Sequence, residues 1–179
     1  MFETIDYLQF GNKNQKRAYL AIENLGIMHS LSEYNPILCD TLPIGIDIES
    51  SDLDIIMNVV EFTSFEQKVT TLYGNYQDFK LKKLSIRNVP VIKANFTFDG
   101  FEIELFGQPK PVKEQYAYLH MIIENSILND YPNLKDEVII LKEQRIKTEL
   151  AFCKLLGLEG DPYDALLEFG KCKEIIHSF

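Results

Sequence analysis

Residues 40–56 read DTLPIGIDIESSDLDII and are the most informative part of this chain. Its second half predicts a strand over 52–60, in which Asp52 and Asp54 project from the same face while Leu53 projects into a core. Two neighbouring carboxylates are costly unless a cation lies between them, so the pair predicts a metal site. The alternative is a solvent-facing pair on an edge strand, where charges prevent pairing between molecules.

The residues upstream of this pair match the spacing of a known signature. Nucleotidyltransferases of the DNA-polymerase-β superfamily carry Gly-Ser, a further Gly, and then Ser-Asp-hydrophobic-Asp-hydrophobic. Residues 40–56 resemble this signature without a gap, with Thr41 at the first serine, Gly45 at the second glycine and Ser51 before Asp52. The resemblance implies a role for Thr41, Gly45 and Ser51 in binding nucleotide phosphates. Ordinary turn formation explains the same residue types.

The resemblance also sets the expected fold, which is an α+β fold with a nucleotidyltransferase-like small mixed β-sheet, flanking helices and a C-terminal helical layer. The wider sequence, including 101–108 (FEIELFGQ) and 160–163 (GDPY), resembles an uncharacterised bacterial family, domain of unknown function 4269. Two positions depart from the signature. Asp40 replaces a glycine that lets the backbone approach a triphosphate, and Ile44 stands where many small members carry arginine. We expect Asp40 to repel phosphate, so that Asp40→Gly strengthens nucleotide binding.

A hairpin is predicted over 91–98 and 101–108, joined by the two-residue turn Asp-Gly at 99–100. In that register the residues flanking the turn pair with each other, and Glu102 and Glu104 share the polar face. The resemblance implies a third carboxylate on a strand beside the aspartates. We assign this role to Glu104, with Glu102 as the alternative. The polar, wet face of an antiparallel sheet explains both glutamates without a metal.

Two further candidates lie in predicted helices. His120 and Glu124 are one helical turn apart, where their side chains can hydrogen-bond each other and His120 can serve as a base. Lys147 is a candidate phosphate ligand for a bound nucleotide. The ordinary alternatives are a packed histidine and a solvated lysine.

Composition restricts the class of partner. The 179 residues carry a net charge of −9, and nucleic-acid binding depends on Lys and Arg that neutralise phosphates, so a nucleic-acid partner is not expected. The chain contains no apolar run long enough for a membrane span and no signal peptide, so we expect no membrane association and a cytoplasmic location. The three cysteines lack the spacing of a zinc site.

We expect a single domain over 1–179, with a nucleotidyltransferase-like core over 1–110 and a C-terminal helical part of the same unit over 111–179. Strands are predicted over 36–42, 52–60 and 81–86 in addition to the hairpin. Helices are predicted over 13–25, from a capping box at Thr63 and Glu66, over 112–129, over 134–156, and from a cap at Asp161 onward. Strands in the middle with helices at both ends are typical of α+β proteins.

The activity that the resemblance implies is metal-dependent nucleotidyl transfer from a nucleoside triphosphate to a small-molecule or protein acceptor. One or two Mg²⁺ or Mn²⁺ ions would be held by Asp52, Asp54 and Glu104. The alternative is a catalytically lapsed nucleotidyltransferase fold that serves as a binding module, which Asp40 and Ile44 favour. A third hypothesis, a hydrolase with Cys39 as nucleophile, lacks a neighbouring base to lower the thiol pKa.

Overall fold

A computed structural model describes residues 2–177 of the chain. The chain divides into two compact units, Met1–Cys39 with Ser51–Val112, and Asp40–Ser50 with Lys113–Phe179. Each unit has its own elements and core.

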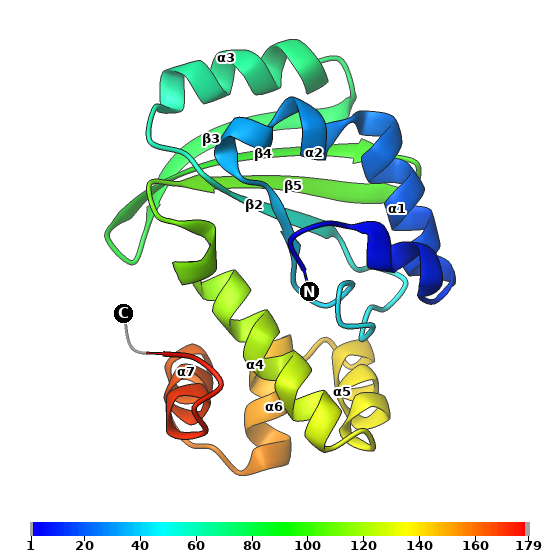
Figure 1. Cartoon of the computed structure of the whole chain (residues 1–179), viewed down its shortest axis with the longest axis vertical. Coiled ribbons are helices and arrows are strands. Elements are labelled where there is room, and N and C mark those ends of the chain that lie inside the picture. The colour runs from blue at the N-terminus through cyan, green and yellow to red at the C-terminus, as the bar shows by residue number, and fades with distance from the viewer. Residues whose placement is uncertain (1, 178–179) are drawn as a thin grey trace. The chain divides into compact units, whose positions relative to one another are not determined.

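The first unit is built on a five-stranded mixed sheet in the order β1-β2-β5-β4-β3 (Figure 1). The strands are β1 (Ile37–Cys39), β2 (Leu53–Asn58), β3 (Gln77–Ile86), β4 (Val89–Phe98) and β5 (Phe101–Gln108). β2 and β5 run parallel, and the other neighbouring strands run antiparallel. β2 therefore has a partner on each side, and β3 is the longer of the two edge strands.

The turn between β4 and β5 fixes the register of the hairpin. Asp99 and Gly100 both have positive φ, of 48° and 78°, as a type I′ turn requires. Phe98 then pairs with Phe101, and Asn95 pairs with Glu104. The predicted register is confirmed, and it places Glu102 and Glu104 on the face opposite to the apolar side chains of the hairpin.

Helices of the first unit are α1 (Lys13–Leu25), α2 (Ile27–Ser30) and α3 (Phe62–Tyr73), with short 3₁₀ turns η1 (Asp6–Phe10) and η2 (Ser32–Tyr34). α1 has the predicted bounds because Asn12 forms a capping box with Gln15 and Gly26 ends the helix at φ 63°. The predicted capping box at Thr63 is wrong. α3 begins at Phe62, one residue before Thr63, and Glu66 instead forms an ion pair with Lys83 of β3.

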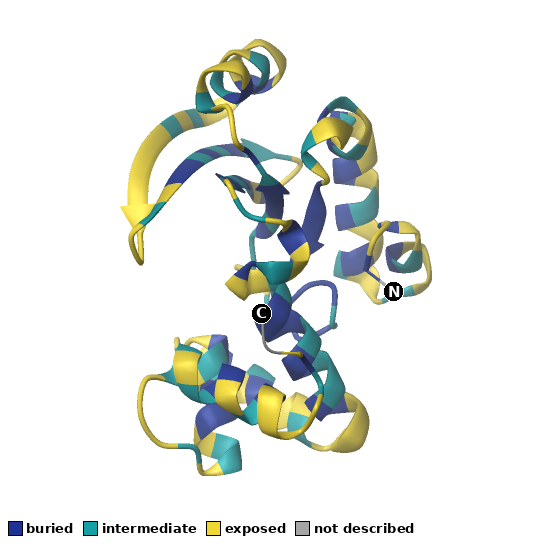
Figure 2. Cartoon of the chain, turned by 60° about the vertical axis from the view of Figure 1, so that its left-hand side comes forward, coloured by how far each residue is buried: buried dark blue, intermediate teal, exposed yellow. Residues whose placement is uncertain are grey.

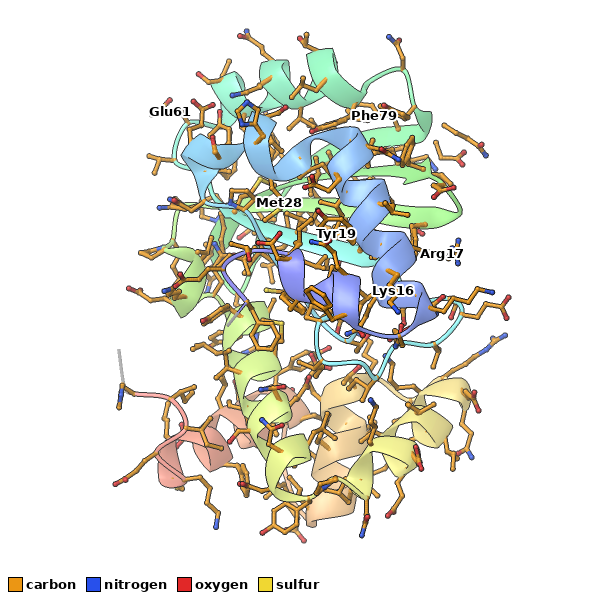
Figure 3. All side chains as sticks on the ribbon, turned by 45° about the vertical axis from the view of Figure 1, so that its right-hand side comes forward. Lys16, Arg17, Tyr19, Met28, Glu61 and Phe79 are labelled. Carbon is orange, nitrogen blue, oxygen red and sulfur yellow. The ribbon has the colours of Figure 1, made fainter. Side chains whose placement is uncertain are left out.

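The core of the first unit lies between these helices and one face of the sheet. Tyr73 stacks on Phe96 with ring centroids 5.1 Å apart, and Leu53 and Ile103 are fully buried. Arg17, labelled on α1 in Figure 3, lies over the ring of Phe101 with its guanidinium carbon 4.9 Å from the centroid. Figure 2 shows the contrast within the sheet, where β2 and nearly all of β5 are buried or half-buried and most of β3 is exposed.

The second unit contains four helices among its described residues, α4 (Tyr116–Asp130), α5 (Leu134–Glu143), α6 (Thr148–Leu156) and α7 (Pro162–Cys172), and a 3₁₀ turn η3 (Val112–Glu114) precedes them. The single helix predicted over 134–156 is wrong, because the chain breaks between α5 and α6, where Arg145 has φ 64°. Asp161 caps α7 as predicted, accepting hydrogen bonds from the amides of Tyr163 and Asp164. Ile46, from the 40–50 connection, is fully buried in the core of these helices. Within residues 2–177, no helix combines the length and apolarity that a membrane crossing needs.

Candidate metal centre

Asp52 and Asp54 lie at the start of a central strand. Leu53 and Ile55 have no exposed surface, while Asp54 is half-buried on the other face of β2, as the alternation predicts. The alternative interpretation of the pair as charges on an edge strand is wrong, because β1 and β5 flank β2 on both sides. The two aspartates are therefore not needed to prevent β2 from pairing with a strand of another molecule.

Asp40 joins this pair. It follows Cys39 directly, and Cys39 lies opposite Asp54 in the antiparallel pairing of β1 with β2. One carboxylate oxygen from each of Asp40, Asp52 and Asp54 lies within 4.8 Å of the others, and all three residues are half-buried. Asp40 has φ 70°, in the left-handed region that glycine adopts without strain.

The chemistry of this donor set suits a hard divalent cation. Mg²⁺ and Mn²⁺ prefer carboxylate oxygens, and three carboxylates at this spacing repel one another unless a cation offsets their charge. Sequence reasoning did not place Asp40 in this acidic cluster, because the pairing of β1 with β2 is not visible in the sequence. The available signal was the position of Asp40 directly after a short apolar run.

Glu104 lies beside Asp54 on the neighbouring strand, in the parallel register of β2 and β5. Its carboxylate accepts a hydrogen bond from the side-chain amide of Asn95 at 3.2 Å and forms an ion pair with Lys93 at 2.6 Å. Glu104 is not one of the three acids in the Asp40 cluster. Glu102, the alternative third acid, is exposed opposite Thr97.

The connection at 40–50 forms the predicted turn. The amide of Gly45 donates to the Leu42 carbonyl, and the amide of Ile46 donates to the Thr41 carbonyl, each at 3.1 Å. Gly45 has φ 72°, which explains the glycine. Thr41 is buried in the second unit, and Ser51 is half-buried directly before Asp52 in the first.

Buried polar side chains gather inside the second unit. The Nζ of Lys142 on α5 donates to the Ile46 carbonyl at 2.8 Å. Glu124 on α4 is fully buried, and its Oε1 has no hydrogen-bond partner among the described residues. Burial raises the pKa of Glu124 well above its usual range, and the negative charges of Glu149 and Asp40 raise it further, while Lys142 opposes them.

The remaining candidates occupy the same unit. His120 is buried, with Nε2 3.0 Å from the Tyr163 carbonyl and Nδ1 3.8 Å from Glu149. Lys147 precedes α6, and its Nζ donates to the Tyr163 hydroxyl at 3.4 Å. Sequence reasoning missed Lys142. Its signal was a lysine four residues after the buried Val138, on the same face of α5.

Solved structures share the fold. The Cid1 poly(U) polymerase bound to Mg and 3′-dATP has a TM-score of 0.54 and 18% identity, over 74% of this chain and 42% of that chain. The GLD-2/RNP-8 complex has a TM-score of 0.53 and 14% sequence identity, over 93% of this chain and 64% of that chain. The polymerase core of TRAMP, an RNA surveillance complex, has a TM-score of 0.53 and 13% sequence identity, over 90% of this chain and 54% of that chain. This chain therefore spans less than two thirds of each of these proteins, and no curated protein matches its sequence.

These structural matches confirm the predicted fold, which is that of the nucleotidyltransferases. Residues 20–169 match the family described as domain of unknown function 4269. The chain belongs to this family, as its sequence predicted.

Proposed function

We propose that the protein is a metal-dependent nucleotidyltransferase. The observation that carries this proposal is the convergence of the Asp40, Asp52 and Asp54 carboxylates within 4.8 Å, on a fold that it shares with polymerases such as Cid1. Asp52 and Asp54 fit the metal ligands of the superfamily signature. Asp40 and Glu104 are the candidates for the third ligand.

One or two Mg²⁺ or Mn²⁺ ions bound there would supply Lewis-acid stabilisation of the charge on the transferring phosphoryl group. The protein's own groups would position the acceptor and remove its proton. In the reaction, an acceptor hydroxyl oxygen forms a bond to the α-phosphorus of the triphosphate. The bond to the β-phosphate oxygen breaks, pyrophosphate leaves with that electron pair, and a carboxylate takes the hydroxyl proton. Glu104, beside Asp54, is the carboxylate that we propose for this step.

Phosphate binding would fall to the residues of the signature turn. We propose Thr41, Gly45 and Ser51 as donors to the triphosphate and Lys147 as a cation for its outer phosphates. His120 is buried among α4 and α7 residues, which favours a structural role over that of a base. The acceptor is proposed to be a small molecule or a protein because the net charge is −9, although Cid1, which shares the fold, is described as an RNA terminal uridylyl transferase.

The second candidate function is a nucleotidyltransferase fold that binds a ligand without catalysis. The observation that favours it is Asp40, whose carboxylate adds a negative charge where the superfamily has a bare glycine. The two functions differ in whether a divalent ion makes a nucleoside triphosphate bind.

The test uses calorimetry and thermal unfolding of the full chain. We expect Mn²⁺ to raise the melting temperature and to enable binding of a non-hydrolysable nucleoside triphosphate. The double variant Asp52→Asn with Asp54→Asn should lose both effects. Glu49→Gln, which changes an exposed acid in the same connection, should keep both. A metal response that survives in the double variant would rule out the assignment.

A further inference from the structure

Lysines line the polar face of the sheet beside the acids. Lys82 of β3 lies directly opposite Lys93 of β4, which in turn lies opposite Phe106 of β5. Two residues away along β3, Lys80 lies opposite Asn95 of β4, and Asn95 lies opposite Glu104 of β5. Paired residues in a sheet project from the same face, so these lysines share the face that carries the acids of β2 and β5.

Lysines on an exposed edge strand such as β3 prevent pairing between molecules, but that role does not explain why Lys82 lies opposite a second lysine, Lys93. Like charges directly opposite each other on neighbouring strands destabilise a sheet. Lys93 is offset by Glu104, 2.6 Å away, but both Lys80 and Lys82 are exposed. Within residues 2–177, no ion pair joins either of them to a carboxylate. In a chain with net charge −9, such a pairing indicates an anionic ligand.

Carboxylates limit how far that ligand extends in one direction along the strands. In the row beyond Lys80, Thr97 donates to Asp78 at 3.4 Å and lies opposite Glu102. A polyanion that continued along the strands in this direction would meet both acids. Across the strands, β3 and β2 are three strand spacings apart, or about 14 Å. The lysines thus suit a single phosphate group on a small molecule.

We propose that Lys80, Lys82 and Lys93 bind the phosphate group of the acceptor, and that the acceptor is a small phosphate monoester with a free hydroxyl, such as a phosphorylated sugar or polyol. The inference rests on the proposed nucleotidyl transfer, because an acceptor bound to these lysines by its phosphate would direct its free hydroxyl toward Asp54 and Glu104. Phe106, whose ring centroid is 5.9 Å from the Lys93 Nζ, offers an apolar surface between the cations and the acids.

The test is an NMR titration of ¹⁵N-labelled full-length protein in EDTA, with glycerol 3-phosphate as the probe and a short oligouridylate as the comparison. Glycerol 3-phosphate should shift the amides of 80–82 and of Lys93. Lys82→Gln should weaken its binding about three- to fivefold, as expected for one exposed ionic contact. Lys83→Gln is the matched control, because Lys83 projects to the other face and pairs with Glu66. It should leave the affinity unchanged.

Three results would overturn the proposal. The first is the absence of shifts at these amides, and the second is an equal loss of affinity in both variants, which would reveal a non-specific charge effect. The third is oligouridylate binding at the same residues about a hundredfold more tightly, which would assign a nucleic-acid acceptor. Because EDTA removes the metal, the titration is independent of Mn²⁺-dependent nucleotide binding. The phosphate site and the proposed reaction can therefore fail separately.

Discussion

Asp40 combines a backbone conformation suited to glycine with a side chain whose carboxylate lies near those of Asp52 and Asp54. Aspartate tolerates the left-handed region better than most residues because its short side chain can bond locally. The sequence suggested only that Asp40 repels phosphate. The cluster supports our proposal that Asp40 is also a metal ligand, and metal affinity distinguishes the two roles.

We expect Asp40→Asn to weaken Mn²⁺ binding about tenfold, because the variant keeps the shape and backbone tolerance of aspartate but removes one ligand charge. Calorimetric titration with Mn²⁺ measures this effect. Glu49→Gln again serves as the control. An unchanged Mn²⁺ affinity together with tighter nucleotide binding would show that Asp40 acts only by repulsion.

Glu124 makes stability depend on pH. Its folded-state pKa lies well above the usual value of 4.5. At pH values between these two pKa values, Glu124 is protonated in the folded protein and ionised in the unfolded chain. As pH rises from 4.5 toward the folded-state pKa, the wild-type protein therefore loses stability, by about 1.4 kcal/mol for each unit of pKa shift. Glu124→Gln removes this titration and should be the more stable protein at about pH 8.

Urea unfolding at about pH 5 and about pH 8 checks this prediction. The difference in the free energy of unfolding between the two pH values should shrink in Glu124→Gln. Glu137→Gln, at an exposed position on α5, should keep the wild-type difference. If all three proteins share one pH dependence, other groups control it.

At the scale of the element, the two faces of β5 have different roles, because one packs in the core and the other carries an acid of the proposed site. Ile103 is fully buried on one face, and Glu104 is half-buried on the other. Ile103→Ala should cost about 2–5 kcal/mol of unfolding free energy through the cavity that it leaves. Glu104→Gln should cost little stability and should lower Mn²⁺ affinity. Chemical unfolding and metal titration of the two variants test the separation.

A contrary result would be large destabilisation of Glu104→Gln with unchanged Mn²⁺ affinity. Glu104 would then be a structural partner of Lys93, and Glu102 would be the remaining candidate on β5.

Elements set by local chemistry were predictable from the sequence. The Asp-Gly turn at 99–100 fixed the hairpin register, and Gly26 fixed the end of α1. The break before α6 was not visible, because apolar residues continue at helical spacing through 134–156 and no proline or glycine interrupts them. The burial of Lys142 was not visible either, since its partner, the Ile46 carbonyl, lies 96 residues away.

For the whole molecule, the prediction of a single domain over 1–179 remains to be tested. The chain passes between the two units more than once, and the 40–50 connection supplies Ile46 to the helical core while its neighbours on each side form β1 and β2. Unfolding of the sheet unit would therefore free both ends of the 40–50 connection, which belongs to the helical unit. We expect one cooperative transition in scanning calorimetry, with equal calorimetric and van't Hoff enthalpies. Two separate transitions would show that the units are independent domains.

The parallel pairing of β2 with β5 has a kinetic consequence. Asp54 and Glu104 are neighbours in space but about 50 residues apart in the chain, so a large loop must close before they meet. The β4–β5 hairpin has a two-residue turn and forms on the microsecond scale. During refolding, pulse-labelled amides of β4 should gain protection before those of β2. In a newly made chain, Asp54 and Glu104 of the proposed metal site would then come together only after the hairpin has formed.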